Sequence, residues 1–156
     1  MKRPLRRELV FQLVETSRLL RTYVEQRARQ HGTTRAQWGV MSRLRRQEGL
    51  KQAALAEQMD LQPISLARLL DRLQSQNLIE RREDPSDRRA YRLFLTPEGR
   101  ALVDDLDSVR TEIAQDVLGE TDEEAILSAL GTLAAIREQI RARSDDKAPA
   151  AAGNAA

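Results

Sequence analysis

Apolar residues recur at every third or fourth position through most of the chain, which is the spacing of one face of an α-helix. In the first half of the chain this pattern predicts four helices, at residues 5–30, 35–48, 52–59 and 63–76. Only residues 60–62 separate the third helix from the fourth, which opens with a proline at a position where the missing N–H is tolerated. A short helix, a tight turn and a second helix are typical of a helix-turn-helix.

The spacing changes from helical to alternating after the fourth helix. Residues 78–82 and 91–95 predict two strands with a turn at 84–87, and therefore a β-hairpin directly after the helix-turn-helix. Two further helices are predicted, one capped by Thr96 and ending at Gly119, the other capped by Thr121.

These elements predict a mainly α protein, namely a winged helix-turn-helix with long N- and C-terminal dimerisation helices. The expected regions are a winged helix-turn-helix at 34–100, dimerisation helices at 1–33 and 101–143, and a disordered tail at 144–156. The outer helices carry more apolar surface than one winged domain covers, so we expect a homodimer. The residues expected at its interface are Leu9, Leu13, Val117, Leu130, Leu133 and Ile140. The alternative is that the same helices form a monomeric bundle.

Charge is divided unevenly along the chain. Net charge is +2, but residues 1–33 carry +5, residues 34–100 carry +4 and residues 101–143 carry −6. Most of the 26 basic residues are arginines, whose planar fork suits phosphates and guanine edges. A basic first half indicates a surface that meets a polyanion, although a merely solvated arginine-rich surface would give the same count.

Composition excludes several classes of protein. There is no cysteine and a single histidine, so we expect neither a disulfide framework nor a metal site. The sequence has no glycine-rich phosphate loop and no histidine-paired nucleophile, so we expect no enzyme and no cofactor. With 32% charged residues and no apolar run near the roughly 18 residues of a spanning helix, we expect a soluble, cytoplasmic protein without membrane contact.

The predicted second helix of the helix-turn-helix carries a polar stripe opposite its leucines. Ser65, Arg68 and Arg72 follow one another at i, i+3 and i+7, and Gln62 lies near the start of the helix. Such a stripe can enter a DNA major groove, where arginine pairs with guanine through two hydrogen bonds. The alternative is a hydrated helix face.

The predicted hairpin is also basic, with Arg81 and Arg82 on its first strand and Arg88 and Arg89 on its second. Guanidinium groups at the tip of a hairpin suit a narrow minor groove, whose negative potential attracts them. We expect Asp87 to orient one of these arginines through a charge-assisted hydrogen bond. A surface turn with offsetting charges is the alternative.

Six segments between Thr34 and Leu102 carry a resemblance to a known family. They are QWGV at 37–40, QAALA at 52–56, SLARLLDRL at 65–73, LIER at 78–81, DRR at 87–89 and LFLTPEG at 93–99. In these segments the chain resembles the MarR family of bacterial winged-helix transcription regulators. Asn77 stands where that family often has glycine, and asparagine can adopt the same left-handed conformation.

The resemblance implies a homodimer that places one recognition helix in each of two major grooves and the wing arginines in the minor groove. Arg89 matches the position that usually enters that groove. The resemblance also implies a small aromatic or anionic effector bound between the dimer helices and the winged domain. The residues expected near that junction are Arg18, His31, Trp38 and Met41. For Trp38 the alternative is a place in the core, and for His31 a role at the helix end.

Together these features predict a sequence-specific regulator of transcription that binds double-stranded DNA. We expect a repressor that binds a pseudo-palindromic operator as a homodimer and is released by a small-molecule effector. The alternative is a winged-helix protein-interaction module without DNA binding.

Overall fold

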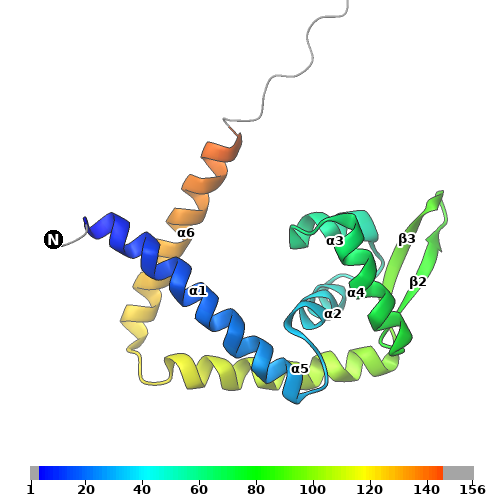
Figure 1. The fold of residues 1–156 in the computed structure, drawn as a ribbon, viewed down its shortest axis with the longest axis horizontal. Helices are drawn as coiled ribbons and strands as arrows, with labels where there is room; N and C mark the ends of the chain where they lie inside the picture. Colours follow the sequence, from blue (N-terminus) through cyan, green and yellow to red (C-terminus); the bar gives the residue numbers. More distant parts are fainter. Residues whose placement is uncertain (1–3, 146–156) are drawn as a thin grey trace, which may run out of the picture. The chain divides into compact units, whose positions relative to one another are not determined.

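The computed structural model describes residues 4–145, a mainly helical region with a small sheet (Figure 1). In chain order its elements are α1 (Leu5–Gln30), α2 (Arg35–Arg46), β1 (Leu50–Lys51), α3 (Gln52–Met59), α4 (Pro63–Ser75), β2 (Ile79–Asp84), β3 (Asp87–Leu95), α5 (Pro97–Leu118) and α6 (Glu123–Asp145). The chain forms two compact units that divide within α5, between Ala114 and Gln115. The predicted fold class, a winged helix-turn-helix with long N- and C-terminal helices, is confirmed.

The core of the first unit is formed by the apolar face of each of its elements. Every third or fourth residue of α4 faces inward, so that Leu66, Leu70 and Leu73 are completely buried. Removing an aliphatic side chain of this size from water contributes about 1.5–3 kcal/mol. The other large, fully buried side chains are Val40, Met41, Leu44, Leu55, Ile79, Leu93, Val103 and Leu106.

Two predicted helix boundaries are confirmed in detail. Thr34 and Gln37 form a capping box, in which Thr34 Oγ1 accepts from Gln37 N at 3.1 Å and Gln37 Oε1 accepts from Thr34 N at 3.2 Å. Asn77 follows α4 with φ of 57°, the left-handed conformation expected for it. The left-handed conformation of Asn77 turns the chain back on itself, so that Leu78 N donates to Leu73 O at 2.9 Å. The helix ends there, and the chain continues toward β2.

Other boundaries differ from the prediction. The cap predicted at Thr121 is wrong, since α6 begins at Glu123 and Asp122 Oδ2 accepts from Ala125 N at 3.3 Å. Aspartate is a strong capping residue, so it competes directly with the nearby threonine. α6 continues to Asp145, so residues 144–145 are helical rather than part of a tail, and the remainder of the predicted tail lies outside the described residues.

The strands form a three-stranded antiparallel sheet in the order β1-β3-β2. β1 was not predicted, because two residues are too few to show a spacing. β2 and β3 are both longer than predicted, which leaves only Pro85 and Ser86 as the turn between them.

The register of the hairpin changes near its tip. It is regular from Ile79 opposite Leu95 to Glu83 opposite Tyr91, and then shifts so that Asp84 pairs with Asp87. Residues 88–90 of β3 therefore have no partner on β2 and form a bulge.

α1 and α5 contribute unequally to the core of the first unit. Near its end α1 buries Ala28, and α5 buries the stripe from Val103 to Ile113. Earlier in α1, several apolar side chains are exposed: Leu5, Leu9, Val10, Phe11, Val14, Leu19 and Leu20. A bilayer-spanning helix, which would need a longer uncharged apolar stretch, does not occur within residues 4–145.

Gly99 lies where the first turn of α5 approaches the chain before β2. A Cβ at this position would stand 1.9 Å from Leu78 O, so we expect Gly99→Ala to destabilise the fold by about 1–3 kcal/mol or more. Gly131→Ala in α6 is the matched control, because its Cβ would meet nothing within 4 Å. That change should leave stability unchanged or raise it by up to about 1 kcal/mol. Urea unfolding of both variants at one protein concentration measures the difference, and equal midpoints would refute the steric argument.

Candidate nucleic-acid interface

The face of α4 opposite its buried leucines is open to solvent. Gln62, Ser65, Arg68 and Arg72 are all exposed, as the spacing predicted. Within residues 4–145, the guanidinium groups of Arg68 and Arg72 have no hydrogen-bond or ion-pair partner. This helix face therefore presents two cations that no intramolecular contact has to release before they bind an anion.

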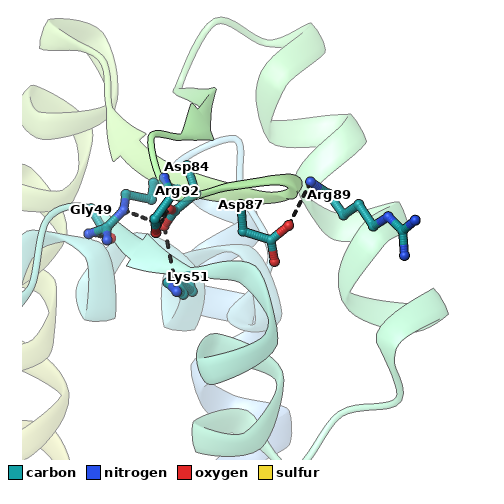
Figure 2. A network of polar contacts seen from close by, with 7 residues as sticks. Gly49, Lys51, Asp84, Asp87, Arg89 and Arg92 are labelled. Carbon is teal, nitrogen blue, oxygen red and sulfur yellow. Dashed lines mark hydrogen bonds and ion pairs between the residues drawn. The ribbon is translucent and has the colours of Figure 1, made fainter.

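Arg88 and Arg89 lie on the bulge of the wing, which is the hairpin of β2 and β3. Both are exposed, and in the described part of the chain their guanidinium groups also lack partners. Asp87 Oδ1 accepts from the backbone N of Arg89 at 3.0 Å (Figure 2). The expected bond from Asp87 to a guanidinium group is therefore wrong. The backbone amide two residues ahead is within easier reach of a short carboxylate, so Asp87 shapes the bulge instead.

Arg81 does not stand at the tip of the wing as predicted. It lies against α4, where its Nη1 donates to Asp71 Oδ1 at 2.8 Å and its Nη2 donates to Ala67 O at 3.2 Å. Its side chain is only 19% exposed. Because β2 packs beside α4, an arginine at this register is close enough to pair with the helix. Arg81 thus connects the wing to α4 through hydrogen bonds and adds no free cation to the tip of the wing.

Arg82 is also engaged within the wing. Its guanidinium carbon stands 4.0 Å from the centre of the Phe94 ring, and the group pairs with Glu80. The side chain remains 59% exposed, so an anion can still reach it. Of the four wing arginines singled out from the sequence, the structure leaves Arg88 and Arg89 free and gives Arg81 and Arg82 partners.

A groove of about 1070 Å³ lies between α3, α4 and the wing. Lys51 and Gln52 line it at the start of α3, and Arg89 and Tyr91 line it from β3. The sequence did not single out Lys51, which is an isolated basic residue, or Tyr91, which the pattern placed only in the second strand of the hairpin. Their place beside α4 depends on the pairing of β1 with β3, which the sequence did not reveal.

Asp84 was predicted in a turn, but its side chain is completely buried. It accepts hydrogen bonds from Ser86 and Arg92. These bonds, above all those from Ser86, hold the pKa of the Asp84 carboxyl far below its usual range. The wing is therefore built around an ionised carboxylate.

Similarity to known proteins identifies the family. The sequence profile of the MarR family matches residues 33–91. The HTH-type transcriptional repressor MdtR of Bacillus subtilis (strain 168) is 32% identical over 123 residues, which span 79% of this chain and 78% of MdtR. The chain belongs to the MarR family. This MarR-family protein is accordingly a DNA-binding transcription regulator and not an enzyme.

Solved MarR-family structures share the fold over nearly their whole length. A crystal structure of MarR matches with 26% identity and a TM-score of 0.73, covering 93% of this chain and 98% of that one. AbsC of Streptomyces coelicolor matches with 20% identity and a TM-score of 0.78, covering 91% and 99%. MepR of S. aureus, solved as a complex with DNA, matches with 23% identity and a TM-score of 0.74, covering 88% and 99%.

The four residues expected to line an effector site of this MarR-family protein have different surroundings in the structure. Arg18 is exposed and pairs with Glu15 at 3.1 Å, and His31 is exposed at the end of α1. Met41 is completely buried, and Trp38 is 4% exposed, so both are core residues. Trp38 therefore packs in the core, which was the alternative considered for it.

Proposed function

We propose that this MarR-family regulator represses transcription by binding a pseudo-palindromic operator as a homodimer. The observation that carries the proposal is the exposed face of α4, where Arg68 and Arg72 have no intramolecular partner within residues 4–145. The free arginines of the wing, Arg88 and Arg89, add a second basic contact on the same winged domain. Repression is inferred from the similarity to MdtR, which is named as a repressor.

In the proposed complex the two basic elements have different roles. Arg68, with Ser65, Arg72 and Gln62, reads base edges in the major groove. Arg88 and Arg89 enter the minor groove, while Arg82 contacts the backbone beside it. Arg81 positions the wing against α4 through Asp71 and does not itself touch DNA.

The second subunit of the proposed dimer covers apolar surface that the single chain leaves open. Leu9 in α1 is 45% exposed, and in α6 Leu130 is 54% and Ile140 is 59% exposed. Val117 is also exposed, whereas Leu13 and Leu133 are half-buried in the single chain. Exposed apolar side chains of this kind are unfavourable in water, and a second copy of the chain can bury them by symmetry.

The proposal includes release by a small aromatic or anionic effector near Trp38. Among the described residues, the buried indole Nε1–H of Trp38 has no hydrogen-bond partner, and the guanidinium carbon of Arg110 stands 5.5 Å from the ring centre. A donor and a cation at one place suit an aromatic carboxylate. Trp38 is the single tryptophan, so its fluorescence reports on this region. Benzoate that released DNA without changing the emission would argue against this location.

A mobility shift with fragments of the source genome tests the central proposal. A regulator should retain a small set of fragments in the presence of excess random DNA, and footprinting should then show two half-sites about one helical turn apart. A protein-interaction module would shift none of them. That outcome would refute the proposal.

The affinity should depend steeply on salt, since binding arginines to phosphates releases condensed counterions. If each subunit neutralises about three phosphates, log K should fall with log salt at a slope of about −5. Fluorescence anisotropy at several salt concentrations measures this slope. A slope near zero would contradict binding through the guanidinium groups of α4 and the wing.

A further inference from the structure

Asp84 lies where the two strands of the wing lose their regular register. Its Oδ1 accepts from the backbone N of Ser86 at 2.8 Å and from Ser86 Oγ at 2.5 Å. Its Oδ2 accepts from Arg92 Nε at 2.7 Å (Figure 2). Ser86 precedes the bulge at 88–90 and Arg92 follows it. One carboxylate therefore holds both ends of the segment that carries the free wing arginines.

The same carboxylate joins the wing to the helix-turn-helix. Lys51 Nζ lies 3.6 Å from Asp84 Oδ2, and the Arg92 guanidinium also donates to Gly49 O at 3.5 Å (Figure 2). Gly49 and Lys51 lie just before α3, so these contacts anchor the bulge to the chain that leads into the helix-turn-helix. Within residues 4–145, the guanidinium groups of Arg82, Arg88 and Arg89 have no bond to Asp84, Arg92 or Lys51.

We propose that Asp84 is the positioning residue of the wing, and that its clamp on Ser86 and Arg92 fixes where Arg88 and Arg89 stand relative to α4. This inference rests on the proposed binding of DNA by the wing. Residues 88–90 lack ladder partners on β2, and the bond from Arg89 N to Asp87 Oδ1 lies within the bulge, so it does not fix the bulge to the rest of the wing. Without the clamp this segment would have to be ordered during binding, and that ordering lowers affinity.

The decisive variant is Asp84→Asn, which keeps the shape of the side chain and removes its charge. We expect the affinity for the operator fragment to fall about tenfold for each wing. A loss of this size corresponds to the entropic cost of ordering roughly one more residue when DNA binds. Glu83→Gln is the matched control, because Glu83 is the adjacent, exposed carboxylate of β2. Loss of its negative charge should leave the affinity unchanged or raise it. Of the two neutralisations, only Asp84→Asn should therefore lower the affinity.

A double-mutant cycle separates positioning from general destabilisation. In the Arg89→Ala background, Asp84→Asn should cause a smaller further loss than in the wild type, because one of the two arginines that it positions is already absent. Amide hydrogen exchange should become faster at residues 88–90 of Asp84→Asn and stay unchanged in α4. Ser86→Ala removes one hydrogen bond at the surface, and should give a smaller loss in the same direction even if Asp84→Asn does not fold.

Wild-type affinity in both Asp84→Asn and Ser86→Ala would overturn the inference, as would losses that simply add to that of Arg89→Ala. If the wild-type protein binds DNA and Arg89→Ala weakens it while Asp84→Asn does not, the positioning role fails and the proposed function stands. If the wild-type protein retains no DNA fragment, the proposed function fails first, and the inference falls with it.

Discussion

Arg68→Ala is expected to remove most of the preference of this regulator for its operator over random DNA. An arginine that forms two hydrogen bonds with guanine contributes about 1–3 kcal/mol of discrimination, which corresponds to roughly 5- to 150-fold for each half-site. Arg68 is exposed on α4 and has no partner among the described residues, so the variant should fold as the wild type does. Anisotropy titrations on operator and random duplexes measure the two affinities.

Arg68→Lys is the control for charge. Lysine keeps the attraction to phosphates but not the planar fork, so binding to random DNA should persist while the operator preference falls. Equal losses on both duplexes for Arg68→Ala would show that Arg68 contacts only the backbone. In that case base recognition would have to come from Ser65, Arg72 or Gln62.

A double change in α1, Leu9→Asp with Leu13→Asp, is expected to produce a monomer that binds the operator 100- to 10,000-fold more weakly, an order-of-magnitude range. Charges on this apolar face would have to be desolvated for a second copy to pack against it. Without the partner, each winged domain binds one half-site alone, and the high effective concentration of the second contact is lost. Analytical ultracentrifugation gives the mass, and anisotropy gives the affinity.

Thr22→Asp adds one negative charge to α1, where the double variant adds two, at an exposed position away from the Leu9 stripe, and should leave both mass and affinity unchanged. A monomeric double variant with full operator affinity would contradict the bivalent mechanism. A dimeric double variant would show that the subunits associate through other residues.

The parts of the fold that sequence predicted are those set by local chemistry. The capping box of Thr34 and Gln37 depends on residues three apart, and the left-handed Asn77 depends on its own side chain. The exposed stripe of Arg68 and Arg72 follows from the helical spacing of the leucines opposite them. Each of these features is encoded within one or two turns of chain, so the pattern alone defines it.

The parts that sequence missed depend on packing between elements. Arg81 was expected at the basic tip of the wing, but β2 packs beside α4, where Asp71, ten positions earlier in the chain, accepts its hydrogen bond. Asp84 looked like a turn residue, because nothing near it in the sequence reveals that Arg92 and Lys51 converge on it. Charge patterning finds basic residues, but it does not tell which of them already have a partner.

The arginines of α4 and the wing whose guanidinium groups have no partner within residues 4–145, namely Arg68, Arg72, Arg88 and Arg89, also have a kinetic consequence. In the proposed complex they hold any duplex loosely through its phosphates, whatever its sequence. A protein that remains near the duplex can slide and hop along it instead of returning to free solution after each encounter. The charges that hold the operator thus also shorten the search for it, and raising the salt concentration should slow that search.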